Sequence, residues 1–174
     1  FSVTKSIVAT VAATLIAEGS LDGGATVATY LPELRHSGVG DATLRQLLDM
    51  TTGLDYTENY VDQKSPVWSL SRAGGFRARP PDYQGPESFF DFLRTLRKAA
   101  PHGETFAYMT VNTDALGAVL RRVSGQSLSA LLSERVFSRL GAEQDAFFTV
   151  DPTGAEFAGG GLNLTLRDLA RVGE

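Results

Sequence analysis

A serine and a lysine lie three residues apart at the start of the chain, Ser2 and Lys5. The apolar residues that follow recur at intervals of three, four and seven from Ile7 to Ile16, which predicts a helix with one buried face. Side chains three positions apart share a face of a helix, so we expect the hydroxyl and the amine to lie within reach of each other. This spacing suits a serine nucleophile beside an amine base.

The chemistry that needs this pair is nucleophilic catalysis. A serine hydroxyl is a weak nucleophile until a neighbouring base takes its proton. An ordinary lysine amine, with a pKa of about 10.4, is almost wholly protonated at neutral pH. The positive end of a helix dipole and a dry pocket both disfavour the ammonium form, and both therefore favour a basic amine. The alternative is structural: Ser2 caps the helix and Lys5 is a solvated surface charge.

A second group of polar residues, Tyr108, Thr110 and Asn112, lies about a hundred residues later, at an expected loop-to-helix entry. A tyrosine hydroxyl between Ser2 and Lys5 could carry the proton to the leaving group as a general acid. An asparagine amide could hold a substrate carbonyl or the lysine. The alternative is again structural, with Tyr108 a half-buried aromatic residue and Asn112 a helix N-cap.

Helices dominate the rest of the chain. Capping patterns predict helices after Thr43, Ser88, Asn112 and Thr165, and apolar periodicity predicts another over residues 128–140. Residues 147–150 are expected to form a strand. No repeat or linker divides the chain, so we expect residues 1–174 to be a single partial domain, a piece of a longer protein.

Residues 54–86 lack periodicity and carry Tyr60, Trp68 and Phe76 among glycines and prolines. A loop of this length is unusual in a compact domain unless it has a function. Its aromatic side chains suit an extended aliphatic or acyl chain, so we expect Phe76 to contact the substrate. A structural alternative for Tyr60 is that it only packs the loop.

Composition excludes several classes of function. The net charge of −4, with both signs interspersed, argues against a nucleic-acid partner, and no apolar stretch is long enough for a membrane span. Cysteine is absent, and His36 and His102 lack further ligands at metal spacing, so we expect neither a metal nor another cofactor. Gly159, Gly160 and Gly161 lack the surroundings of a phosphate loop. The compartment is not fixed; we favour the cytoplasm.

Together these motifs resemble the serine β-lactamase and DD-peptidase superfamily, in its class C-like branch. Within that superfamily they are most similar to the 6-aminohexanoate-dimer hydrolases and related carboxylesterases. The resemblance also rests on YLPEL at 30–34, LLDMTTGL at 47–54, and GGL with TLRDLA at 160–170. It implies an α+β fold, of which this chain is the mostly helical part with the nucleophile helix. Most of the antiparallel sheet and the Lys-Thr-Gly-like third motif have no counterpart here.

The resemblance also implies roles. Ser2 corresponds to the nucleophile, Lys5 to its general base and Tyr108 to the proton carrier, while Tyr60 matches a tyrosine that contacts the scissile region of the substrate. Asn112 matches the asparagine of the second motif less closely, because Thr110 occupies the usual place. The implied activity is acyl-enzyme hydrolysis of small amides or esters without a cofactor, in a protein compatible with a homodimer. Two alternatives are a β-lactamase or DD-peptidase and a non-catalytic helical binding module.

Overall fold

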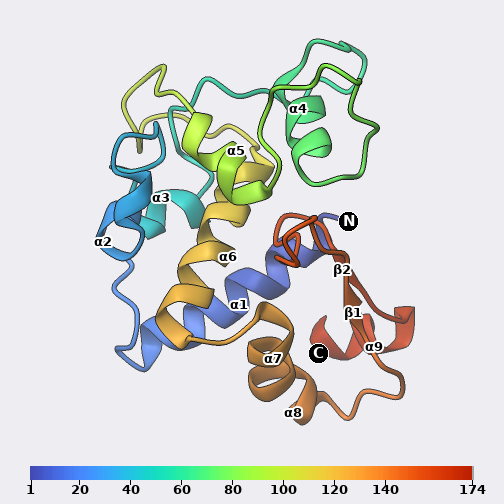
Figure 1. Cartoon of the computed structure of the whole chain (residues 1–174). Coiled ribbons are helices and arrows are strands. Elements are labelled where there is room, and N and C mark those ends of the chain that lie inside the picture. The colour runs from blue at the N-terminus through green and yellow to red at the C-terminus, as the bar shows by residue number, and fades with distance from the viewer. Residues whose placement is uncertain (174) are drawn as a thin grey trace.

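The computed structural model describes residues 1–173 and is mostly helical, with one small sheet near its C-terminal end (Figure 1). The helical elements in chain order are α1 Val3–Ala17, α2 Val27–Tyr30, η1 Pro32–Leu34, α3 Leu44–Leu48, α4 Pro66–Ala73, α5 Phe89–Thr95, α6 Thr110–Ser124, α7 Leu128–Leu132, η2 Ser133–Phe137, α8 Ser138–Leu140 and α9 Leu166–Gly173. The sheet consists of β1 Phe147–Phe148 and β2 Leu162–Asn163, which pair antiparallel.

Helix α1 buries the face that its apolar periodicity predicts. Ile7, Val8, Val11 and Leu15 are each at most 3% exposed. The chain leaves the helix through Gly19, whose φ of 74° lies in the left-handed region that glycine adopts without strain. In Figure 1 the helix crosses the molecule, and its N-terminal end lies beside the loop that leads into β2.

Helix α6 is the centre of the fold, because it contacts α1, α2, α3, α5 and α7. Every residue from Thr110 to Leu120 is buried, including the polar residues of its first turns. Buried polar groups must find hydrogen-bond partners, and here Asn112 and Asp114 find theirs outside the helix. The first turns of α6 are therefore tied to two distant segments of the chain.

The irregular region contains one helix, α4, with loops on both sides. Arg79 organises the second loop, since its guanidinium donates to the backbone oxygens of Arg72, Ala73 and Glu87. The carbonyls at the C-terminal end of α4 lack partners within the helix, and a cation there is also favoured by the helix dipole. The loop after α4 is thus closed onto the helix end.

Several predicted boundaries differ from the structure. Helix α6 begins at Thr110, ahead of the cap expected at Asn112, and Asn112 is buried in the first turn instead of capping it. The helix over 128–140 contains a π-helical turn, η2, between α7 and α8. The expected strand is shortened to β1, and Val150 makes an isolated bridge to Glu156. The capping box of Thr43 and Gln46 is confirmed.

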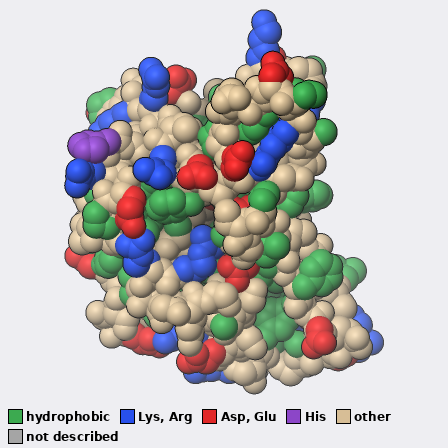
Figure 2. Space-filling model, in the orientation of Figure 1, with side chains coloured by type: hydrophobic (Ala, Val, Ile, Leu, Met, Phe, Trp, Pro, Cys, Tyr) green, Lys and Arg blue, Asp and Glu red, His purple; other side chains and the backbone are tan. Residues whose placement is uncertain are grey.

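The surface carries charges of both signs. On the face in Figure 2, Lys and Arg side chains alternate with Asp and Glu, without a large area of one sign. Among residues 1–173, no helix combines the length and apolar character that crossing a bilayer requires. In that same range no three His, Asp or Glu side chains come together as a metal-binding group.

Candidate active site

Ser2 and Lys5 are joined by a hydrogen bond at the start of α1. The Lys5 Nζ donates to Ser2 Oγ over 3.1 Å and to the backbone oxygen of Gly159 over 2.5 Å. Lys5 is only 8% exposed, whereas Ser2 is exposed. The amine is therefore held behind an accessible hydroxyl, and the structural alternative of a solvated lysine does not describe it.

The N-terminal turn of α1 is fixed against β2 by Thr4. The Thr4 hydroxyl donates to the backbone oxygen of Phe1 over 2.8 Å and accepts from the amide of Leu162 over 3.1 Å. The Thr4 side chain is fully buried. A serine at this helix start consequently has a backbone that is anchored on both sides, as a positioned nucleophile needs.

Gly159 lies so close to α6 that no side chain fits there. A Cβ atom on Gly159 would lie 2.2 Å from Thr110 Cγ2, well inside van der Waals contact. The amide of Gly159 donates to Asp114 Oδ1 over 2.8 Å. Burial raises the pKa of Asp114 to about 7, against the lowering effects of this amide and of the Lys5 charge.

A cavity of about 670 Å³ opens at Ser2, within the size range of small-molecule sites. Its walls come from the start of α1, from α4, from the loop after α4, from the start of α6 and from the segment around β2. The lining residues are Phe1, Ser2, Tyr60, Val67, Trp68, Leu70, Ser71, Phe76, Phe89, Thr110, Thr149, Phe157, Gly159, Gly160 and Asn163.

One wall of this cavity is a cluster of three phenylalanines. Phe157 stacks on Phe89 with ring centroids 4.9 Å apart, and Phe76 lies 5.4 Å from Phe157 and 5.8 Å from Phe89. Phe76 is 47% exposed and lines the cavity, so its ring is available for contact with an apolar group. Its predicted contact with substrate stays a prediction.

Tyr60 lies at the rim of the cavity and is 58% exposed. Its ring meets Trp68 edge-on at 6.0 Å, and its hydroxyl donates to Glu58 Oε2 over 2.7 Å. The other carboxylate oxygen of Glu58 accepts from the amide of Thr110, at the start of α6. Partial burial and the hydrogen bond to Glu58 raise the pKa of Tyr60 to about 12, so the phenol stays a proton donor at neutral pH.

The aromatic ring of Tyr108 contacts the Lys5 amine. The Lys5 Nζ lies 5.1 Å from the ring centroid, a cation–π distance, and Tyr108 is 45% exposed. Within residues 1–173 its hydroxyl has no hydrogen-bond partner. The structure thus brings the residue to the lysine, with the hydroxyl free to turn towards a bound substrate.

Thr110 and Asn112 lie on different faces of α6. Thr110 lines the cavity, but Asn112 is fully buried, accepts from the Thr52 hydroxyl over 2.6 Å and donates to the Met50 sulfur. Asn112 is among the residues expected to contact substrate, and the structure does not bring it into the cavity. Two residues along a helix turn the side chain by about 200°, which explains why only one of the two faces the cavity.

The sequence did not point to the partners that hold the site together, which are Gly159, Asp114 and Glu58. Each acts across a long separation in sequence, so no local spacing reveals it. The one available signal was the run of three glycines at 159–161, because consecutive glycines often mark a close approach of backbone.

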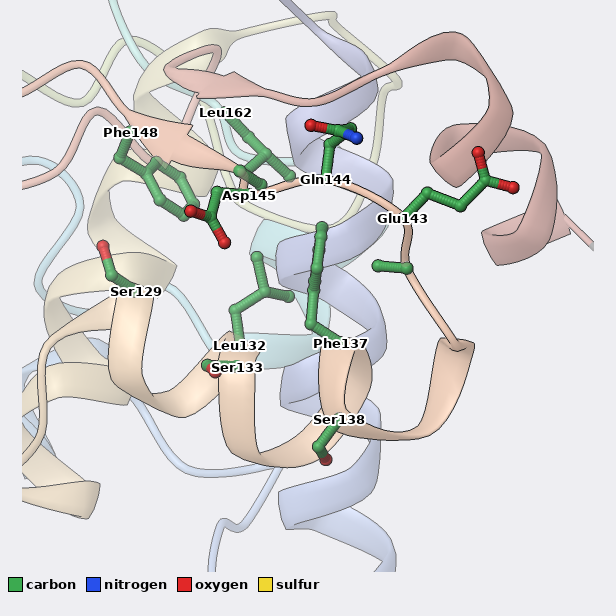
Figure 3. Close-up of a pocket in the computed structure, with 12 residues that line it drawn as sticks. Ser129, Leu132, Ser133, Phe137, Ser138, Glu143, Gln144, Asp145, Phe148 and Leu162 are labelled. Carbon is green, nitrogen blue, oxygen red and sulfur yellow. The ribbon is translucent and has the colours of Figure 1, made fainter.

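A second cavity, of about 470 Å³, lies between α7–η2–α8 and the β1–β2 pair (Figure 3). Leu132 and Phe137 line its helical side, with Phe148 and Leu162 on the strand side. Glu143 points away from these side chains toward α9, where it pairs with Arg167 and Arg171. This cavity has no counterpart of the Ser2–Lys5 pair among its lining residues.

Comparison with known proteins places this arrangement in a family. Residues 1–173 match the family model described as Beta-lactamase. The chain belongs to the beta-lactamase family. A curated relative, the 6-aminohexanoate-dimer hydrolase of Paenarthrobacter ureafaciens, is 42% identical over 172 residues, which are 99% of this chain and 43% of that protein. Esterase EstB of Burkholderia gladioli is 32% identical over 161 residues, 87% of this chain and 38% of that protein.

Solved structures show the same fold. A Bacillus anthracis protein assigned provisionally as a 6-aminohexanoate-dimer hydrolase superposes with a TM-score of 0.92 at 33% identity, over 99% of this chain and 45% of that one. A class C beta-lactamase superposes with a TM-score of 0.68 at 19% identity, over 98% of this chain and 48% of that one. The chain thus spans less than half of the length of these relatives, and it holds the mostly helical part of the beta-lactamase fold, as the sequence predicted.

Proposed function

We propose that this beta-lactamase-family chain carries the nucleophile, base and substrate cavity of a serine hydrolase that cleaves small amides or esters through an acyl-enzyme on Ser2. The observation that carries the proposal is the 3.1 Å contact from the buried Lys5 amine to the accessible Ser2 hydroxyl, at the wall of an apolar cavity. A base within hydrogen-bond reach of the hydroxyl is what activation of serine requires.

The proposed acylation moves one proton and exchanges one bond. Ser2 Oγ bonds to the substrate carbonyl carbon while its proton passes to the neutral amine of Lys5. The bond from that carbon to the leaving nitrogen or oxygen then breaks. Tyr108 gives its phenolic proton to the leaving atom and regains one from Lys5. Water subsequently hydrolyses the ester on Ser2, which releases the carboxylic acid and restores the hydroxyl.

The cavity favours an extended apolar acyl chain. Phe76, Phe89 and Phe157 offer ring faces on one side, and Trp68 and Tyr60 close the rim. The two relatives are named as a 6-aminohexanoate-dimer hydrolase and an esterase, which supports a scissile amide or ester in this cavity. We propose the same substrate class for this protein, with no cofactor in the reaction.

The decisive experiment is active-site labelling of the complete gene product with a fluorophosphonate. We expect the probe to add to Ser2, as read by peptide mass spectrometry, and Ser2→Ala to abolish both labelling and turnover of p-nitrophenyl acetate. Ser6→Ala is the matched control: this exposed serine lies one turn further along α1 and does not line the cavity.

The alternative functions predict different results. A β-lactamase or DD-peptidase would be acylated rapidly by penicillin and would turn over linear aliphatic amides poorly. A non-catalytic binding module would take up neither probe, and wild-type turnover by Ser2→Ala would overturn the assignment of the nucleophile.

A further inference from the structure

Asp114 is a buried acid that faces the back of the proposed site from the second turn of α6. Its side chain is 4% exposed, and Oδ1 accepts the amide proton of Gly159 over 2.8 Å. Its Oδ2 is buried and has no hydrogen-bond partner in the described part of the chain. An unsatisfied carboxyl oxygen in a protein interior costs folding free energy, so its presence needs a reason.

Gly159 connects this acid to the base. Its N–H donates to Asp114, and its C=O accepts from Lys5 Nζ over 2.5 Å. Glycine is the residue with the most conformational freedom, so its carbonyl direction must be set by its contacts. The following amide, of Gly160, has only a 3.3 Å bond to the backbone oxygen of Phe157. Of the two hydrogen bonds that the amides on either side of this carbonyl donate, the bond from Gly159 to Asp114 is therefore the shorter.

We infer that Asp114 is a positioning residue for Lys5: by fixing the backbone of Gly159, it aims the carbonyl that holds the amine against Ser2, an inference that rests on the proposed function. A base displaced by about an ångström can lose about a hundredfold in rate, so a second layer of contacts that sets its position affects turnover strongly. Asp114 does not touch the substrate cavity, so its effect is expected on kcat and not on KM.

Charged groups face Asp114 from three elements: Lys5 of α1, Arg121 of α6 and Glu58 of the loop before α4. Burial outweighs the lowering effects of Lys5 and Arg121, so the pKa of Asp114 is raised.

The test compares Asp114→Asn and Asp114→Ala in the complete gene product, with kcat and KM measured from pH 5 to 9. Asparagine keeps an oxygen acceptor for Gly159 and loses the charge, so we expect a fall in kcat of less than about tenfold. Alanine loses the acceptor, and we expect kcat to fall about thirty- to a hundredfold with KM within about threefold.

Thermal unfolding separates this role from a structural one. The pKa of Asp114 is raised to about 7, so the folded state holds its proton more tightly and loses stability as the pH rises from about 4 to 7. Asp114→Asn has no carboxyl to ionise and therefore does not lose this stability. It should be at least as stable as the wild type at pH 8. Asp168→Asn is the control: this buried acid fixes the amides of Glu143 and Gln144 far along the chain, and its loss should lower Tm without lowering kcat.

The outcomes distinguish this inference from the proposed function. If Ser2→Ala abolishes turnover while Asp114→Ala keeps wild-type kcat, the positioning role is refuted and the nucleophile stands. The positioning role is refuted in the same way if the loss in Asp114→Asn merely tracks a fall in Tm. If Ser2→Ala retains turnover, the proposed function itself fails.

Discussion

The two cavities of this structure differ in volume, but they differ more in the groups that contact the hydroxyls of their serines. The first, of about 670 Å³, has the exposed hydroxyl of Ser2 with the buried amine of Lys5 behind it. The second, of about 470 Å³, is lined by Ser129, Ser133 and Ser138. Ser129 donates to Glu156, and Ser138 donates to the backbone oxygen of Glu134, one turn earlier in η2. A hydroxyl engaged in holding a helix together is not available as a nucleophile.

The surroundings of the serines in the two cavities also differ in the charged group beside them. Glu156 already accepts the amide of Ser129 and the guanidinium of Arg121, so it acts as a helix cap and ion-pair partner. Lys5, by contrast, is directed at Ser2 and otherwise contacts the Gly159 carbonyl and the Tyr108 ring. We propose that the decisive difference is this positioned base.

The largest effect should come from removing that base. Lys5→Ala is expected to lower kcat/KM for p-nitrophenyl acetate by about a thousandfold or more, since nucleophile and base act as a unit. Circular dichroism should show an unchanged fold. Ser133→Ala, in the second cavity, should leave turnover within about twofold. Substantial turnover by Lys5→Ala would mean that the two cavities do not differ in the way we describe.

The sequence was informative where the chemistry is local. Ser2 and Lys5 meet because one helical turn brings residues three apart together, and the pattern of a single helix contains that information. Thr43 and Gln46 form their capping box for the same reason. These features depend on near neighbours, so a short window of sequence predicts them.

The sequence was uninformative where the chain folds back on itself. Asn112 has the residue type of a helix cap, but tertiary packing extends α6 to Thr110 and buries the amide against Thr52. The contact of Lys5 with Gly159 spans 154 positions, and no window of the sequence contains both. Such contacts are decided by how helices pack, which local propensity does not specify.

An intermediate effect is expected at Tyr60, at the rim of the first cavity. A leaving amine must be protonated to depart, whereas p-nitrophenolate departs readily without a proton, so a phenol near the scissile bond should help amides more. We predict that Tyr60→Phe lowers hydrolysis of a linear aliphatic amide by about ten- to a thousandfold, or about 1.4 to 4 kcal/mol in barrier, with a much smaller loss for the ester.

The comparison of both substrates on one variant decides the role of Tyr60. If the tyrosine only packs the loop against Trp68, both activities should fall together, with a lower Tm. Glu58→Gln provides a matched change, because it weakens the acceptor of the Tyr60 hydroxyl while leaving the ring in place. Equal losses on amide and ester would leave only the packing role.

The smallest effect should come from paired aromatic truncations, one in each cavity. Phe76 is 47% exposed in the first cavity, so Phe76→Ala should raise KM for an apolar acyl chain by about three- to thirtyfold, with little change in Tm. Phe148 packs on the core beside the second cavity, so Phe148→Ala should cost about 1 to 3 kcal/mol of stability and leave KM unchanged. Kinetics and thermal melts on the two variants measure this crossover directly. A rise in KM for Phe148→Ala would show that the second cavity also binds substrate, because loss of a core contact alone lowers the folded population without altering the affinity of the molecules that remain folded.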